Sequence, residues 1–180
     1  MKTKAKLRES ALNERLALSH AEYLARNQSL SEQLLAYIEQ SNFKSIHFFL
    51  SIVKNNEPDF KDLFPALWND GRKIMVSKTH LKQKTLSHYW LEPSTVLKET
   101  SWGIPEPTEA VETSIENAEL IVVPLLLADR SGHRLGYGGG FYDKMLKKYK
   151  GATAGVSLFP PVENLPVMPW DVPLQKIFFA

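Results

Sequence analysis

Glycine is concentrated in one short segment of this 180-residue chain. Five of its nine glycines fall between Gly132 and Gly140, directly before a helical pattern over residues 141–149. Glycine loses more backbone freedom on folding than any other residue, so a cluster is tolerated where the backbone needs positive φ or approaches a ligand closely. The start of a helix also favours anions through its free N–H groups and its dipole. The segment therefore predicts an anion site, with a flexible surface loop as the alternative.

The glycine spacing differs from two common nucleotide-binding motifs. No Gly-Lys-Ser or Gly-Lys-Thr follows the run, and Gly136, Gly138 and Gly139 do not give the G-x-G-x-x-G spacing of a dinucleotide site. Arg134 and Lys144 add positive charge at the two ends. The ligand that these residues predict is a polyphosphate, most simply a nucleotide.

Composition excludes several classes of protein. The chain has no cysteine, which removes disulfides, zinc–thiolate sites and cysteine nucleophiles, and its formal charge of +2 is too small to indicate a nucleic-acid partner. Its charged N-terminal sequence does not resemble a signal peptide, and its apolar runs are too short to span a membrane. We expect a cytoplasmic enzyme or binding protein, with no nucleic acid or membrane as partner.

Alternating helical and extended patterns predict an α/β fold in which residues 1–180 form a single domain. Residues 2–40 read as two helices, the second starting after the capping box at Ser19. The continuously apolar segment 118–125 is typical of a central parallel strand. We expect a three-layer α/β/α sandwich with a mostly parallel central sheet. The other predicted strands are 45–51, 73–77, 86–91, 151–158 and, at an edge, 174–179.

Ligands of such sheets bind beyond the carboxyl ends of the strands. The turn after Leu50 and the glycine segment both follow predicted strands, so one site can collect both. Lys4 and Arg8 share a helical face, with Arg15 near it, and cations so placed suit phosphate oxygens. A solvated helix face is the alternative.

Three carboxylates are candidates for the same site. Asp143 can hold Mg²⁺ beside a phosphate, although the dipole of a helix also stabilises a carboxylate in its first turn. Asp171 is a possible second ligand, and Glu57 lies in a turn where an exposed carboxylate is unremarkable. The histidines show no metal-ligand spacing and no serine has a nucleophile-elbow pattern, so covalent catalysis has no visible candidate.

The segment from Val123 to Asp143, VPLLLADRSGHRLGYGGGFYD, closely resembles the signature of the 5-formyltetrahydrofolate cyclo-ligase family, also called methenyltetrahydrofolate synthetases. The similarity extends over nearly the whole chain. The N-terminal helix with its two cations, the turn with Glu57, the Gly-Ile-Pro-Glu-Pro element ending at Pro107 and the closing Trp-Asp pair at Asp171 come in the family's order.

The resemblance implies ATP- and Mg²⁺-dependent conversion of 5-formyltetrahydrofolate into 5,10-methenyltetrahydrofolate, with ADP and phosphate released. Such a reaction asks the protein for positioning and charge neutralisation rather than for a nucleophile. A non-catalytic nucleotide- or folate-binding protein of the same fold is the alternative, and a different ATP-using enzyme is a third reading. We expect a monomer, with a dimer as the alternative.

The resemblance also implies roles for individual residues. Mg²⁺ is assigned to Asp143 and Asp171, and catalysis to Arg134 and Tyr142. Glu57 has a physical rationale as a folate ligand, since a carboxylate can accept a pair of hydrogen bonds from the amino-pyrimidine edge of the pterin. The implied folate ligands are Ile52, Glu57, Tyr137, Gly138, Gly139, Gly140 and Phe141. The implied ATP ligands are Lys4, Arg8, Arg134, Leu135, Gly136, Tyr137, Gly138, Gly139, Gly140, Phe141 and Tyr142.

The chain departs from the family pattern in three places. Phe141 stands where a tyrosine is common, so it offers no hydroxyl. Tyr137 and Gly139 occupy positions that are basic in some relatives, which leaves Arg134 and Lys144 to supply more of the positive charge. The tail after Ile177 lacks the usual threonine-rich end.

Overall fold

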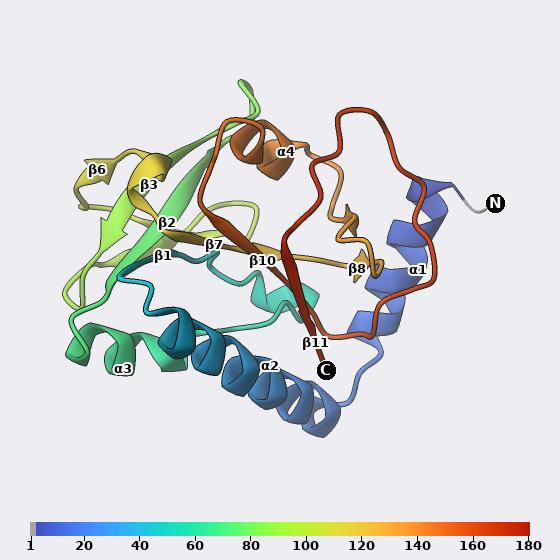
Figure 1. Ribbon diagram of the computed structural model, residues 1–180, viewed down its shortest axis with the longest axis horizontal. Helices are drawn as coiled ribbons and strands as arrows, with labels where there is room; N and C mark the ends of the chain where they lie inside the picture. The colour runs from blue at the N-terminus through green and yellow to red at the C-terminus, as the bar shows by residue number, and fades with distance from the viewer. Residues whose placement is uncertain (1–2) are drawn as a thin grey trace.

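A seven-stranded sheet forms the centre of the molecule in the computed structural model, which describes residues 3–180 (Figure 1). The strand order is β11-β10-β7-β1-β2-β3-β6. The strands from β11 to β2 are parallel, whereas β3 and β6 pair antiparallel at one edge. These strands are β1 (Ser45–His47), β2 (Lys73–His80), β3 (Thr85–Leu91), β6 (Glu112–Thr113), β7 (Leu120–Pro124), β10 (Ala152–Ser157) and β11 (Lys176–Phe179).

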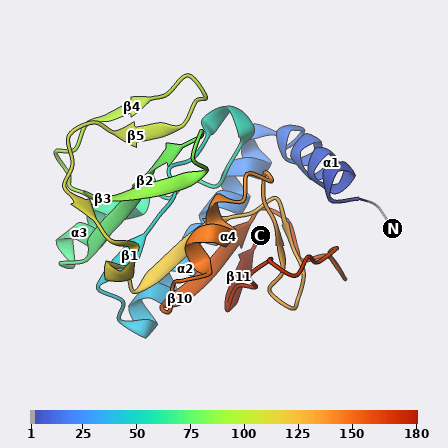
Figure 2. The ribbon, with the colours of Figure 1, turned by 90° about the horizontal axis from the view of Figure 1, so that it is seen from above.

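Helices cover both faces of this sheet, which confirms the predicted layered α/β fold. Helices α2 (His20–Ser41) and α3 (Phe64–Asn69) lie against one face, and α4 (Phe141–Leu146) lies against the other. Helix α1 (Lys4–Leu16) flanks the sheet beside the small hairpin of β8 (Leu127–Ala128) and β9 (Arg134–Leu135) (Figure 1). A second hairpin, β4 (Leu97–Glu99) with β5 (Pro105–Pro107), lies beside β2 (Figure 2). Short 3-10 turns cover Val53–Asn55, Lys61–Leu63 and Ile115–Asn117.

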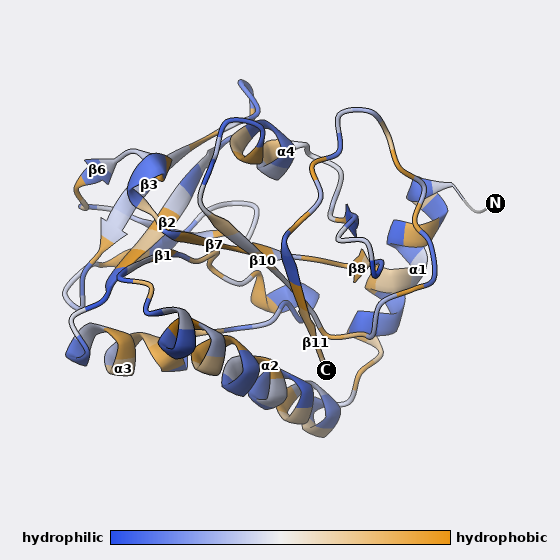
Figure 3. Ribbon diagram, in the orientation of Figure 1, coloured by the Kyte–Doolittle hydropathy of each residue, from blue (hydrophilic) through white to orange (hydrophobic). Residues whose placement is uncertain are grey.

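The largest hydrophobic core lies between α2, α3 and the sheet. Leu30, Leu34 and Ile38 follow the helical period along α2 and are fully buried. They face the strands, while the opposite side of α2 is polar (Figure 3). Helix α2 begins with the predicted capping box, in which the Ser19 hydroxyl accepts from the Glu22 N–H and the Glu22 carboxylate accepts from the Ser19 N–H.

Several predicted boundaries were wrong. Helix α4 ends at Leu146 rather than at Tyr149, and the β8–β9 hairpin separates the glycine loop (residues 136–140) from β7. The chain after Asp59 forms a 3-10 turn followed by α3, where Pro65 fixes the first turn. Helix α1 begins at Lys4, and Lys2 lies outside the described residues.

The strand order reverses direction at β1. The chain passes from β1 to β2 on one side and returns through β7, β10 and β11 on the other, so β1 and β7 form a topological switch point. In open α/β sheets ligands bind in the crevice beyond the carboxyl ends of strands at such a point. The residues that follow these two strands are therefore the first place to look for a site. Among residues 3–180, no helix is long and apolar enough to cross a membrane.

The capping box gives a prediction about stability. Replacing Ser19 with Ala should lower the free energy of unfolding by about 1 kcal/mol, because the first turn of α2 loses its side-chain acceptor. Urea denaturation followed by circular dichroism measures this. Ser19→Thr keeps the hydroxyl and serves as the control; equal stability of the two variants would contradict the role of the cap.

Candidate active site

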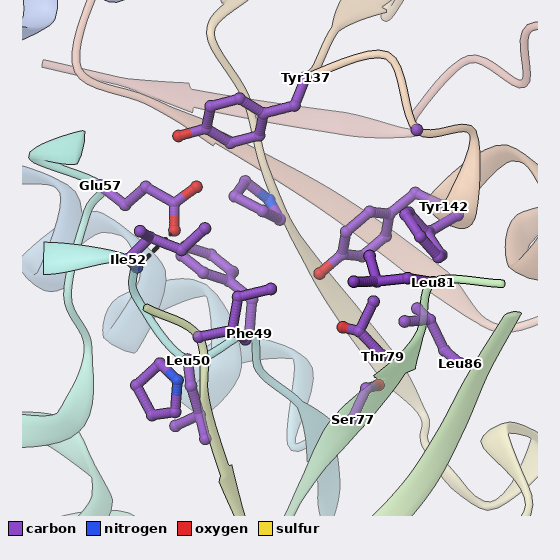
Figure 4. A pocket seen from close by; sticks show the side chains of 15 residues that line it. Phe49, Leu50, Ile52, Glu57, Ser77, Thr79, Leu81, Leu86, Tyr137 and Tyr142 are labelled. Carbon is purple, nitrogen blue, oxygen red and sulfur yellow. Dashed lines mark hydrogen bonds between the residues drawn. The ribbon is translucent and has the colours of Figure 1, made fainter. Parts of the chain in front are cut away.

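A cavity of about 230 Å³ lies at the switch point. Phe49 and Leu50 after β1, and Pro124 at the end of β7, form part of its wall. Strands β2 and β3 contribute Ser77, Thr79 and Leu86, and the glycine loop with the start of α4 closes another side. Figure 4 shows these side chains around the cavity. The remaining lining residues are Ile52, Glu57, Leu81, Ile104, Pro105, Tyr137, Gly139, Phe141 and Tyr142.

Glu57 places a carboxylate in the wall of this largely apolar cavity. Its side chain is almost fully buried, with only 3% of the residue exposed, and its Oε2 accepts the Ile52 N–H at 2.7 Å (Figure 4). Burial raises the pKa of Glu57, and the Ile52 N–H, the Tyr137 hydroxyl and the charge of Arg15 oppose that rise. The sequence alone left open an exposed turn carboxylate; the structure shows a buried one.

Two tyrosine hydroxyls lie in the same cavity as the carboxylate. Tyr137 points toward Glu57, and Tyr142 points into the cavity near Thr79 and Leu81 (Figure 4). Burial, and then the negative charge of Glu57, raise the pKa of Tyr137 to about 12 and also raise the pKa of Tyr142. Both hydroxyls therefore stay protonated at neutral pH and can donate hydrogen bonds.

A second cavity, of about 140 Å³, lies on the other side of the glycine loop. Arg8 Nε donates to the Gly136 carbonyl at 2.9 Å, and the Arg8 guanidinium lies beside Gly138. Gly138 and Gly140 adopt φ of +92° and +72°, values that side-chain-bearing residues rarely adopt. A cleft of about 720 Å³ continues outward past Lys144, Lys147, Met168 and Trp170.

Two pairs of opposite charge stand in this second cavity. Arg134 donates to Asp143 Oδ1 at 2.6 Å and also to the Val172 carbonyl, and Lys4 forms an ion pair with Asp171. Partial burial would raise the pKa of Asp171, but hydrogen bonds from Lys4 and from the Met168 N–H lower it. Both carboxylates are therefore held among cations that can also contact phosphate oxygens.

The donor set of the second cavity fits Mg²⁺ better than a metal bound by protein ligands alone. Within residues 3–180, no three histidine, cysteine, aspartate or glutamate side chains cluster as a metal site. Mg²⁺ is usually held by one or two carboxylates together with substrate phosphates and water. Asp143 and Asp171 line the same cavity as Lys4, Arg8 and Arg134, so this donor set is compatible with such a metal.

The glycine loop and the start of α4 separate the two cavities and belong to both. Tyr137, Gly139, Phe141 and Tyr142 line each of them, as does Pro124 at the end of β7. A ligand in one cavity would therefore contact the same short segment as a ligand in the other. The position of Phe141 also accounts for Gly139, because a Cβ there would lie 2.6 Å from the Phe141 ring.

The structure brings together almost all of the predicted residues. Every predicted ATP ligand except Leu135 lines the second cavity; the Leu135 side chain is instead buried beneath α1. Of the predicted folate ligands, Gly138 and Gly140 do not line the first cavity and lie on the side of the second. The sequence did not predict the lining residues on β2, β3 and the β4–β5 hairpin. The only sequence signal for any of them was the Gly-Ile-Pro-Glu-Pro resemblance, which pointed to the hairpin.

Comparisons with known proteins give one consistent result. The sequence model of the 5-formyltetrahydrofolate cyclo-ligase family matches residues 1–180. A 5-formyltetrahydrofolate cyclo-ligase of Haemophilus influenzae is 33% identical over 83% of this chain and 83% of the relative, and one of Escherichia coli is 28% identical over 91% and 92%. The structure of Aquifex aeolicus 5,10-methenyltetrahydrofolate synthetase superposes with a TM-score of 0.80 at 28% identity, covering 98% of this chain and 89% of the other.

The burial of Glu57 predicts a stability gain from its removal. When the pH is above 4.5, the ordinary pKa of a glutamate, the Glu57 carboxyl of the unfolded chain loses its proton. The carboxyl of the folded protein has a raised pKa and still holds its proton until the pH reaches that higher value. Folding stability should therefore fall as pH rises through this window and stay reduced above it. Glu57→Gln keeps an acceptor for the Ile52 N–H, so it should be more stable than the unmodified protein at about pH 8 and nearly equal at about pH 4.

Urea denaturation at the two pH values measures the difference. Glu109→Gln, at an exposed carboxylate, is the matched control and should change stability equally little at both. A Glu57→Gln variant that is less stable at the higher pH would contradict the destabilising effect of the buried carboxylate.

Proposed function

The chain belongs to the 5-formyltetrahydrofolate cyclo-ligase family, and we propose that its two adjoining cavities carry out an ATP- and Mg²⁺-dependent ring closure. The substrate is 5-formyltetrahydrofolate, and the products are 5,10-methenyltetrahydrofolate, ADP and phosphate. The observation that carries this proposal is the set of residues that line both cavities, because it brings the two ligands next to each other, as phosphoryl transfer requires.

The first cavity is the proposed folate site. Its wall is mostly apolar, which suits a flat heterocycle. Glu57 supplies a carboxylate that accepts hydrogen bonds from the amino-pyrimidine edge of the pterin. Ile52 packs beside that carboxylate, and Phe141 and Tyr137 provide aromatic surface for the ring. Gly139 also lines this cavity, and its lack of a side chain leaves room for the Phe141 ring.

The second cavity is the proposed site of ATP. Lys4, Arg8 and Arg134 surround the space with positive charge, and the loop from Gly136 to Gly140 supplies backbone groups without side chains. Asp143 and Asp171 would hold Mg²⁺, which supplies neutralisation of phosphate charge when it is bound. The bound nucleotide would then share Arg134 and Lys4 with these carboxylates.

The chemistry proceeds in two displacements. The formyl oxygen of the folate attacks the γ-phosphorus, forming an O–P bond while the bond to ADP breaks. N10 then attacks the formyl carbon, the C–O bond to phosphate breaks, and N10 loses its proton. Arg134 neutralises charge during phosphoryl transfer, and the Tyr142 hydroxyl, which lines both cavities, donates a hydrogen bond to the reacting oxygen.

Turnover can be measured directly by the absorbance of the methenyl product. Mixing the protein with Mg-ATP and 5-formyltetrahydrofolate should produce the methenyl band with one phosphate released per product. Reactions without ATP, and with EDTA, are the controls. Folate binding without any product would favour the alternative of a non-catalytic binding protein, and ATP hydrolysis that does not depend on folate would favour a different ATP-using enzyme. The cytoplasmic location and the monomeric state stay predictions.

Arg134 gives the sharpest test of the ATP site. Arg134→Ala should lower turnover by about 100-fold or more, because the transferring phosphate loses its neutralising contact and Asp143 loses its partner. Arg134→Lys keeps the charge but not the two-pronged geometry and should retain part of the activity. Folate affinity should hardly change.

Arg130→Ala is the matched control, since it removes an exposed arginine from the same hairpin. Steady-state kinetics over a range of ATP concentrations, with calorimetry for folate binding, measure these effects. Near-normal turnover of Arg134→Ala would overturn the proposed ATP site.

A further inference from the structure

Arg15, in the last turn of α1, is a buried cation that the proposed catalytic steps do not use. Only 1% of the residue is exposed, and its Nε and Nη1 atoms have no hydrogen-bond partner among residues 3–180. Its remaining nitrogen donates to the Tyr137 hydroxyl. A buried charge with unpaired donors is unfavourable, and an apolar side chain of similar volume would pack there more stably. Anchoring of the helix therefore does not account for an arginine at this position.

The surroundings of Arg15 connect it with Glu57, which lines the folate cavity and not the ATP cavity. Its guanidinium lies 5.5 Å from the centre of the Tyr137 ring, and Asn55 Nδ2 lies 3.4 Å from the Tyr137 hydroxyl. Asn56 Nδ2 donates to the Arg15 carbonyl at 3.2 Å, which ties the end of α1 to the turn that leads into Glu57. Arg15 thus contacts Tyr137, and the hydroxyl of this tyrosine points toward the Glu57 carboxylate, as Figure 4 shows.

The groups that face Glu57 come from several elements. Tyr137 lies on the glycine loop and Tyr142 on α4, while Tyr23 of α2 donates to the Glu57 carbonyl at 2.9 Å. Arg15 supplies the positive charge that acts on this carboxylate among residues 3–180. Burial favours the neutral carboxyl, which would donate a hydrogen bond where the amino-pyrimidine edge needs two acceptors.

We propose that Arg15 is a positioning residue of the folate cavity, which fixes the Tyr137 hydroxyl against Glu57 and supports the charged form of that carboxylate. The inference rests on the proposed function, in which the Glu57 carboxylate accepts hydrogen bonds from the folate. Arg15 acts through Tyr137 and Glu57 and does not line the cavity itself. Lys4 and Arg8 anchor the same helix elsewhere, so the contribution of Arg15 can be separated from the docking of α1.

The experiment is calorimetric titration of the full chain with 5-formyltetrahydrofolate, without nucleotide, between about pH 5.5 and about pH 9. Arg15→Met should weaken folate binding about tenfold at the acid end and much less at the alkaline end, because Glu57 ionises less readily. Arg15→Lys keeps the charge and should recover most of the affinity. The affinity for Mg-ATP, which depends on Lys4 and Arg8, should be unchanged in both variants.

Two results would overturn the proposal. An equal loss of folate affinity at every pH, or a parallel loss of Mg-ATP affinity, would mean that Arg15 only anchors the helix. If Arg15→Met does not fold, the pH profile of Arg15→Lys against Arg15→Gln makes the same comparison. Glu57→Gln tests the premise separately. If the loss of affinity at acid pH persists in this variant, Glu57 is not the group that binds the folate, and the proposed ATP site is not affected by that result.

Discussion

The arrangement of the site depends on contacts that α1 makes with the glycine loop. A glycine-rich segment has little tendency to hold one conformation, because each glycine loses much freedom on ordering. Here the Arg8 guanidinium binds the Gly136 carbonyl at 2.9 Å, and Arg15 binds the Tyr137 hydroxyl. Lys4 binds Asp171 on the C-terminal segment that closes the same cavity. Three cations on one short helix thus fix two segments that are distant in the sequence, and the face expected to bind phosphate also assembles the site.

The sheet determines where that loop must lie. Strands β1 and β7 are neighbours at the switch point, so the segments after them diverge and leave a crevice between them. The turn after β1 carries Glu57, and the chain after β7 passes through the β8–β9 hairpin before it returns as the glycine loop. The loop therefore divides the crevice into an apolar part and a cationic part. A heterocycle binds in an apolar environment and a polyphosphate in a cationic one, and a reaction between the two requires that these environments adjoin.

Sequence reasoning predicted those features that depend on local pattern. The apolar segment that became β7, the capping box at Ser19 and the layered α/β fold all follow from periodicity and residue preference. The β8–β9 hairpin was missed because its strands are two residues each and pair only through the tertiary fold. Leu135 was assigned to ATP from its place in the motif, whereas its contacts under α1 depend on how that helix packs. The burial of Glu57 could not be predicted either, since the turn that holds it is polar in sequence.

Glu57 shows why a site of this kind limits stability. A carboxylate removed from water by apolar neighbours raises the free energy of the folded protein, and its pKa rises accordingly. A glutamine would remove that desolvation cost, but its side chain has one acceptor oxygen where the amino-pyrimidine edge presents two donors. Hydrogen bonds from the Ile52 N–H at 2.7 Å and the nearby charge of Arg15 offset part of the penalty without filling the cavity. Under the proposed function, the folate cavity would keep a destabilising charge because recognition of a donor pair requires it, and the buried Arg15 would serve the same requirement.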